Sequence, residues 1–337
     1  MSRCGGRREL SVEADGFGRA FGAFIVRRLA GGVVLLVVVV AATFVLISLA
    51  PGDTAQVLAG QSGADPEYLQ EIRERLELDR PLPYQVKSYL GGAVRGDLGF
   101  SVVRGQPVSD AILARLGASA LLAGTAMGLA ALLGVLLGVF AAARRGRSTD
   151  LVISVLSLVG YSMPVFWLGQ LLVALFAVRL HWLPAGGMRS AEGASGVIDV
   201  ARHLVLPAGS LASLLLALIV RVTRAAMIDA LEQEYTTVAR GKGLSERRVL
   251  FKHALRNASR PVVTVLTGYL GLVLTGAVLV ETVFVWPGLG RLLYDSVLAR
   301  DAPMLTGILI FSTSLVVLAN ILADVVYRLL DPRAGFR

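Results

Sequence analysis

The sequence contains little charge and only one cysteine. Asp, Glu, Lys and Arg make up 17% of the 337 residues, whereas a soluble domain usually has about a quarter. Because Cys4 is the single cysteine, an internal disulfide framework and a CxxC metal motif are excluded. The three histidines, His181, His203 and His253, are scattered, and none has another histidine or cysteine at metal-ligand spacing.

Motifs for nucleotide binding and hydrolysis are also lacking. The chain has no GxxxxGKS/T phosphate loop, no HExxH and no GxSxG. The run Gly241-Lys242-Gly243 lacks the upstream glycine and the following Ser or Thr that a phosphate loop needs. We therefore expect a chain that is not an enzyme and that binds no cofactor itself, neither ATP nor magnesium nor another metal.

Apolar residues are abundant by contrast, at 55% of the chain. Because about 20 apolar residues in a helix span the hydrocarbon core of a bilayer, long uncharged stretches predict transmembrane helices. Six stretches contain no Asp, Glu, Lys, Arg or His, and they cover residues 29–52, 116–143, 151–178, 204–220, 261–280 and 302–323. The pattern predicts an all-α, polytopic membrane protein with six transmembrane helices. The predicted spans contain no ionisable side chain at mid-depth, where ion-coupled carriers usually have one.

The net charge of +9 is distributed unevenly along the chain. With both termini on the cytoplasmic side, the inside segments hold 21 Lys and Arg residues and the outside segments hold 12. An excess on the inside is the positive-inside pattern of multi-pass proteins in the cell membrane. We therefore interpret the basic character as topology in a lipid bilayer, with the excess facing anionic headgroups, and expect no nucleic-acid partner.

The uncharged stretches divide the chain into segments. In the extracytoplasmic segment, Asp65 and Pro66 suit the N-cap and first position of a helix, so an amphipathic helix is predicted at residues 65–78. The rest of that segment, with Pro81, Pro83 and several glycines, is expected to be mostly loop. The predicted segments are a disordered tail (1–20), the first span (21–52), the extracytoplasmic loop (53–115), a core with spans two to six (116–330) and a C-terminal tail (331–337).

Small residues recur at every fourth position of the second span. They lie at Ala126, Ala130, Gly134, Gly138 and Ala142. Since small residues let helices approach closely in a bilayer, we expect tight helix packing there, above all at Ala130, Gly134 and Gly138. Proline in the third and fourth spans, at Pro164 and Pro207, predicts kinks or a span start.

The basic segment between spans four and five, residues 221–260, is the most informative. Residues 229–240 are expected to form a helix that Gly241 and Gly243 end. Ser245 is a suitable cap for a second helix that contains Val249, Leu250, Phe251 and Leu255. Composition alone favours a different interpretation of this helix–turn–helix segment, as an amphipathic connector that lies on the headgroups.

The run ARGKGLSERRVLFKHALRNASRP in this segment closely resembles the coupling loop of ABC importer permeases. In that family the pattern is Glu-Ala-Ala, three residues and Gly, and here Thr237, Val238 and Ala239 fall on the first three positions and Gly243 on the last. Only Ala239 and Gly243 match strictly, a departure shared by the peptide and nickel branch of the family. The resemblance implies an ATPase-coupling loop formed by Glu234, Tyr235, Thr237, Val238, Ala239, Arg240, Gly241, Lys242, Gly243 and Leu244.

Other segments resemble the same family in the same order along the chain. They are LAPGD from Leu49, LELDRPLPY from Leu76, RGDLGFS from Arg95, ETVFVWPGLGRLL from Glu281 and LLDPR from Leu329. Together they are similar to the first permease subunit of dipeptide, oligopeptide or nickel importers. In the last outside segment we expect solvated or helix-capping roles for Glu281 and Asp295, and an interfacial aromatic followed by a turn at Trp286-Pro287-Gly288.

The resemblance implies an ABC type I importer permease fold and a set of partners. These are a homologous second permease subunit, two cytoplasmic ATPase subunits that bind ATP and magnesium, and an extracytoplasmic solute-binding protein. The implied substrate is a short peptide, with nickel or another small solute as the alternative. An intramembrane enzyme is disfavoured because the spans lack catalytic residues, and the coupling loop argues against a scaffold without transport.

Overall fold

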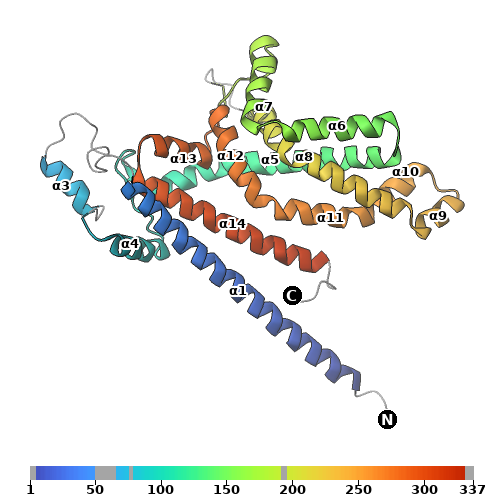
Figure 1. The fold of residues 1–337 in the computed structure, drawn as a ribbon, viewed down its shortest axis with the longest axis horizontal. Coiled ribbons are helices and arrows are strands. Elements are labelled where there is room, and N and C mark those ends of the chain that lie inside the picture. Colours follow the sequence, from blue (N-terminus) through green and yellow to red (C-terminus); the bar gives the residue numbers. More distant parts are fainter. Residues whose placement is uncertain (1–4, 50–65, 76–78, 191–195, 331–337) are drawn as a thin grey trace.

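The computed structural model describes residues 5–49, 66–75, 79–190 and 196–330, and it is almost entirely helical (Figure 1). Its elements are α1 (Gly5–Leu49), α3 (Pro66–Arg75), α4 (Leu82–Val94), β1 (Phe100–Ser101), β2 (Gln106–Pro107), α5 (Val108–Ala143), α6 (Ser148–Ser162), α7 (Val165–Leu172), the π-helix η1 (Val173–Arg179), α8 (Val197–Leu231), α9 (Glu234–Gly241), α10 (Glu246–Arg248), the π-helix η2 (Val249–Ala254), α11 (Leu255–Gly268), α12 (Leu270–Val283), α13 (Leu289–Leu298) and α14 (Ala302–Leu330). The prediction of an all-α protein is confirmed, with one two-stranded antiparallel hairpin, β1–β2, added.

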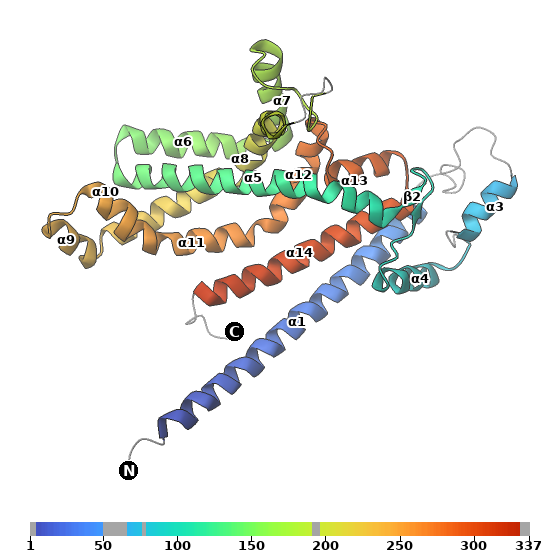
Figure 2. The same cartoon turned by 180° about the vertical axis from the view of Figure 1, so that it is seen from behind.

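Helices α5 and α8 lie side by side at the centre of the molecule. Helix α6 covers them on one side and α11 and α12 on the other, and α14 packs against α11 and α12 (Figures 1 and 2). Helix α1 runs along the outer side of α14. Helices α9 and α10 lie at one end of this bundle, whereas α4, the hairpin and α13 lie at the opposite end.

Small residues bring α5 and α8 together. Ala130, Gly134 and Gly138 are all buried in this contact. A Cβ atom added at Gly134 would stand 2.6 Å from Cγ2 of Ile219, and one added at Gly138 would stand 2.6 Å from Cβ of Thr223. Contacts of that length cannot form, so α5 and α8 approach closely because these two positions have no side chain.

Four helical segments are long and apolar enough to cross a membrane, namely Val26–Leu49, Val108–Ala143, Val197–Leu231 and Ala302–Val325. A fifth crossing is possible if α6 and α7–η1 count as one span. The predicted third span is not straight, because the chain bends by 104° between Ser162 and Val165, where Pro164 prevents a continuous helix. Pro207, by contrast, lies inside α8. The predicted fifth span is divided at Tyr269 into α11 and α12, so the number of six spans stays a prediction.

The structure corrects two expectations near the N-terminus. The tail predicted to be disordered is helical from Gly5, because α1 continues through it into the apolar stretch. The segment around Pro81 and Pro83 was expected to be loop but forms α4. Proline is tolerated in the first turn of a helix because no backbone donor is needed there. The predicted helix at residues 65–78 corresponds to α3, while Asp65 and residues 76–78 lie outside the described residues, as do positions 50–53 of the LAPGD motif.

Substitution of Gly138 by alanine should destabilise the protein by about 1–3 kcal/mol, because the added methyl group must displace Thr223 or the backbone of α8. Thermal unfolding of the purified protein in detergent measures this effect. Gly124→Ala is the matched control on the same helix, since a Cβ atom at Gly124 meets no atom within 4 Å and alanine favours a helix over glycine by up to about 1 kcal/mol. Equal unfolding temperatures for the two variants would contradict the proposed close approach.

Candidate functional site

The segment between α8 and α11 forms a short protruding helix on a buried base. Helix α8 ends at Leu231, and the chain turns at Glu232 and Gln233 before α9 begins. The expected single helix at residues 229–240 is therefore wrong, because it is interrupted at this turn. The buried hydroxyl of Thr236 donates to the carbonyl oxygens of Leu231 at 2.8 Å and Gln233 at 2.7 Å, and it thereby fixes α9 to the end of α8.

A glycine turn connects α9 to α10. Gly243 has a φ of +77°, a conformation that costs an ordinary L-residue roughly 1–2 kcal/mol. Its N–H donates to the carbonyl oxygen of Arg240 at 2.9 Å, and the N–H of Leu244 donates to that of Ala239 at 3.3 Å. Glycine at this position is thus needed for the path of the backbone, whereas Gly241 is an exposed helical residue with no close neighbour.

An ion pair spans this turn. The Arg240 guanidinium donates from Nε and Nη2 to the two carboxylate oxygens of Glu246, at 3.2 and 2.9 Å. Hydrogen bonding to Arg240 lowers the pKa of Glu246 below its usual value, and the carboxylate raises the pKa of Arg240. Because the pKa of Glu246 is lowered in the folded state, this pair stabilises the turn above the unfolded pKa of about 4 and is lost at lower pH. Both side chains are exposed, so its contribution is small.

Helix α9 presents most of the predicted coupling residues to solvent. Ala239 is buried and Leu244 is half-buried. These two residues therefore contribute little to the exposed surface of the segment. The remaining members of the predicted set are all exposed: Glu234, Tyr235, Thr237, Val238, Arg240, Gly241, Lys242 and Gly243. Val238 has 55% of its surface exposed, which makes it the most exposed large apolar residue of α9.

The base under α9 is built from buried apolar residues and two ion pairs. Val139, Ala142, Met227, Ala230, Ala254 and Ala258 form a hydrophobic cluster between α5, α8, η2 and α11. Buried Asp150 at the start of α6 accepts two hydrogen bonds from Arg224 of α8, at 2.6 and 2.7 Å, and a third from the N–H of Gly146. Arg145 pairs with Glu232 at 2.6 Å. The α5–α6 turn is thereby tied to the end of α8 from which α9 extends.

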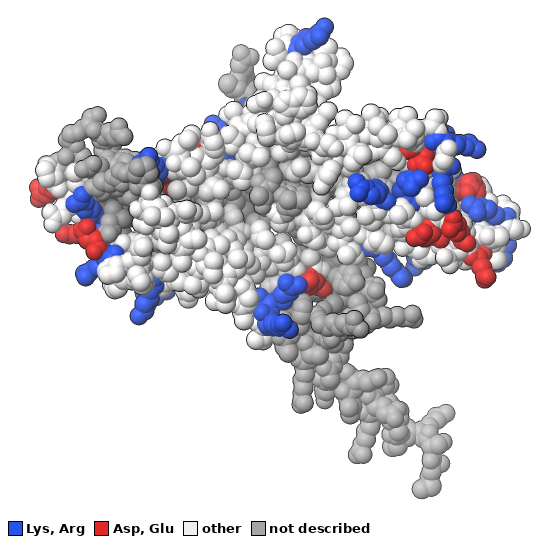
Figure 3. Space-filling model, in the orientation of Figure 1, with Lys and Arg blue, Asp and Glu red and all other residues white. Residues whose placement is uncertain are grey.

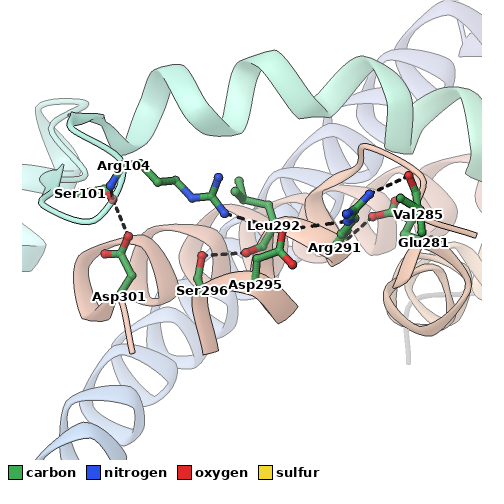
Figure 4. A network of polar contacts seen from close by, with 9 residues as sticks. All are labelled: Ser101, Arg104, Glu281, Val285, Arg291, Leu292, Asp295, Ser296 and Asp301. Atoms are coloured by element: carbon green, nitrogen blue, oxygen red, sulfur yellow. Dashed lines mark hydrogen bonds and ion pairs between the residues drawn. The ribbon is translucent and has the colours of Figure 1, made fainter. Parts of the chain in front are cut away.

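The opposite end of the bundle carries a second polar network, at the junction of α12 and α13 (Figure 4). Glu281 was expected to be solvated or to cap a helix, and the structure shows a fully buried carboxylate. One oxygen accepts from the Ser119 hydroxyl of α5 at 2.6 Å and the other accepts from the N–H of Arg291 at 3.0 Å. Ser119 in turn accepts from the N–H of Leu289 at 2.7 Å. Glu281 therefore caps the N-terminus of α13, where a negative charge is favourable, but it does so in the interior.

Close packing at this junction explains the WPGLG sequence. Trp286 was expected at the membrane interface but is completely buried, and its indole N–H donates to the carbonyl oxygen of Ala118 at 2.9 Å. A Cβ atom at Gly288 would lie 2.2 Å from the Glu281 carboxylate, and one at Gly290 would lie 2.5 Å from Cα of Val278. Both glycines are needed because α12 and α13 approach each other too closely for a side chain.

The far end of α13 is attached to the β-hairpin and to α14. The hydroxyl of Ser101 donates to the carboxylate of Asp301, and both side chains are buried. Asp295, also expected to be solvated, is half-exposed and lies 3.8 Å from Arg104 and 4.0 Å from Arg291 (Figure 4). Both ends of α13 are thus fixed to other elements. Among the described residues, no group of three or more His, Cys, Asp or Glu side chains could hold a metal ion.

Residues 134–335 of the chain match the family described as binding-protein-dependent transport system inner membrane component, and residues 22–123 match the N-terminal segment of that family. The sequence is 40% identical to a di/tripeptide transport system permease protein of Pseudomonas aeruginosa, covering 92% of this chain and 98% of the relative. It is 37% identical to a dipeptide transport system permease protein of Escherichia coli, with the same coverage. It is also 38% identical to an oligopeptide transport system permease protein of Bacillus subtilis, covering 93% and 99%.

Among solved structures, the fold is similar to a chain of the MetNI methionine ABC transporter in inward-facing conformations. The TM-score is 0.53, and the similarity covers 65% of this chain and 95% of that chain. The sequence identity is 16%, so this likeness concerns the fold alone. It confirms the predicted permease fold of ABC importers.

Substitution of Ser119 by alanine should lower stability by about 1–3 kcal/mol, because it leaves an oxygen of Glu281 and the N–H of Leu289 buried without their partner. Ser210→Ala is the matched control. Ser210 is also buried, but its hydroxyl donates only to the carbonyl oxygen of Leu206 in the same helix. When the hydroxyl is removed, that carbonyl oxygen keeps its hydrogen bond within the helix. Thermal unfolding of both variants in detergent makes the comparison, and an equal loss in both would contradict the capping role.

Proposed function

Because the chain belongs to the family of binding-protein-dependent transport system inner membrane components, we propose that it is the permease subunit of an ATP-driven importer of short peptides. The peptide substrate is supported by relatives that are 37–40% identical over more than nine-tenths of the chain and are peptide permeases by name. The permease itself is a transport protein without an enzymatic site of its own. We expect ATP hydrolysis to take place in separate ATPase subunits that bind this chain.

The observation that carries the mechanism is helix α9, an exposed helix on a buried base. We propose that its exposed face, with Thr237 and Val238 at the centre, docks into a cleft on a cytoplasmic ATPase subunit. Amphipathic helices commonly bind by placing their apolar residues in a groove of the partner. Helix α9 is short, and Thr236 and the glycine turn hold it at both ends. Motion of the ATPase would therefore move α9 together with the end of α8 rather than bend it alone.

The two ion pairs beneath α9 support this transmission. Asp150–Arg224 joins α6 to α8, and Arg145–Glu232 joins the α5–α6 turn to the end of α8. Since α5 and α8 are also in close contact along the second half of α5, a force on α9 reaches three helices at once. Rigid-body displacement of packed helices is a general way to convert local motion into a change of access.

The proposed topology places both termini and α9 on the cytoplasmic side of the cell membrane. Figure 3 shows charged side chains at both ends of the molecule and an almost uncharged middle. The orientation is supported by the sequence, in which the segments placed inside hold 21 of the 33 Lys and Arg residues. Basic residues concentrate on the cytoplasmic side of multi-pass proteins. A homologous second permease subunit would complete the pore, and a solute-binding protein would deliver the peptide to the opposite end, near α4 and α13.

Substitution of Val238 by glutamate should reduce co-purification of the ATPase subunits about tenfold, because it places a charge in the middle of the docking surface. Val238 has 55% of its surface exposed and lies in a regular helix, whereas a change at Gly243 would strain the backbone at a positive φ. Val94→Glu is the control, since Val94 is 89% exposed at the opposite end of the molecule. Normal ATPase binding by Val238→Glu would contradict the assignment of α9 as the docking helix.

Uptake measurements in a strain that lacks its own peptide and nickel importers test the substrate. The strain receives this chain with its partner subunits, and labelled dipeptides, longer peptides and nickel ions are offered separately. We expect ATP-dependent uptake of short peptides that unlabelled peptides compete away. Uptake of nickel without uptake of any peptide would show instead that the chain serves the nickel branch of the family.

A further inference from the structure

Between α6 and α8 the chain forms an arm that stands out from the bundle. The arm consists of α7 and η1, residues Val165–Arg179, and Figures 1 and 2 show it projecting sideways from the central helices. Val165 and Gly169 are buried at its base, where a Cβ atom at Gly169 would lie 3.0 Å from the ring of Phe284. One side of the arm is thereby held against the end of α12.

The opposite side of the arm is not covered by the rest of the chain. Trp167, Leu171, Leu175 and Val178 follow one another at intervals of three or four residues, which places them along one side of a helix. Between 43% and 64% of their surface is exposed. Gln170 lies beside them and is exposed too. These five residues form what we call the exposed face of the arm.

The position of the bend determines how deep the arm lies in the membrane. Arg144, Arg145 and Arg147 directly precede α6 and mark the cytoplasmic headgroup layer in the proposed topology. The 15 residues of α6 rise about 22 Å, whereas the hydrocarbon core is about 30 Å thick. With α6 along the membrane normal, the bend of 104° directs the arm along the membrane plane. The arm then lies in the outer half of the hydrocarbon layer.

Gln170 makes this position unfavourable for a subunit that is alone. Its carboxamide has two donor hydrogens and an acceptor oxygen, and no described residue of the chain is bonded to that group. The hydroxyls of Ser157 and Ser162 in α6 differ, because they donate to carbonyl oxygens of their own helix. Hydrocarbon offers the carboxamide no partner, so a helix of another protein must supply one.

Only one of the proteins expected to assemble with this chain lies in the hydrocarbon layer. The ATPase subunits are expected in the cytoplasm and the solute-binding protein outside the membrane, whereas a second permease subunit shares the bilayer. Resting on the proposed function, we propose that the exposed face of the arm packs against the second permease subunit and that Gln170 hydrogen-bonds to it. The apolar side chains supply the area of this contact, and the carboxamide fixes its register.

Site-specific photo-crosslinking tests what covers the arm. The photoreactive residue p-benzoylphenylalanine is placed at Leu171 or Leu175 in membranes that contain the complete transporter. Leu156 of α6, with 65% of its surface exposed, is the control position on a helix that faces hydrocarbon. We expect both arm positions to form an adduct of this chain with the second permease subunit, and the control to form none. No such adduct at either arm position would overturn the proposal, and so would an adduct of two copies of this chain.

Replacement of Gln170 by leucine distinguishes a protein neighbour from lipid. Against lipid, leucine is more favourable than glutamine, so the variant would assemble at least as well as wild type. Against a protein helix, loss of one interhelical hydrogen bond should lower the fraction of second permease subunit that co-purifies in detergent about fivefold. Ser154→Leu is the matched control, since it removes an exposed polar group from α6 and should leave that fraction unchanged. An undiminished fraction in Gln170→Leu would exclude the carboxamide contact.

Failure of this proposal is distinct from failure of the proposed function. If the wild-type transporter takes up no peptide, the substrate assignment fails, yet the adducts still show whether the arm contacts the second permease subunit. If no second permease subunit co-purifies with wild type, the proposed pairing fails, and the role of the arm fails with it. The arm proposal fails alone when wild type is paired and takes up peptide but Leu171 and Leu175 give no adduct.

Discussion

Helices α5 and α8 form the central pair of the bundle, and the other core helices are arranged around their close contact. It forms because Gly134 and Gly138 remove the side chains that would otherwise separate the two helices. In a bilayer the hydrophobic effect gives no driving force between helices, so close packing of small residues must supply the attraction. Helices α6, α11 and α12 then pack against this pair, and both polar networks are attached to it.

The two ends of the bundle use polar groups for different purposes. At the α9 end, the exposed pair Arg145–Glu232 and the pair of Arg224 with buried Asp150 support a protruding helix whose outer face stays exposed. At the opposite end, the carboxylate of Glu281 is buried and accepts one hydrogen bond on each oxygen, so it links α13 to α5 and α12. A buried carboxylate is tolerated only with several donors, and the backbone of α13 and Ser119 provide them. The α9 end thus presents an exposed helix, whereas the opposite end is closed by buried contacts.

Much of the fold and part of the site could be predicted from the sequence because those features are local. Uncharged stretches predict long apolar helices, and small residues at every fourth position predict a packing face; the structure has both. The coupling role of the run from Ala239 to Leu244 stays a prediction from resemblance. Features that depend on distant neighbours could not be predicted in this way. The burial of Glu281 depends on Ser119, which is 162 residues away. The helix at residues 82–94 was missed because its prolines lie in the first turn, where they are compatible with a helix.

Sequence patterns and the order of motifs are sufficient to recognise a helical membrane permease with one basic segment between two spans. Periodicity, charge and motif order are properties of the linear chain, and they need no partner to be recognised. Which side chains face one another follows from the packing of the helices: Trp286 and Glu281 are interior, and Val238 is exposed while Ala239 is buried. The reason is that burial depends on which helix covers which face, and the sequence pattern of one helix does not specify its neighbours.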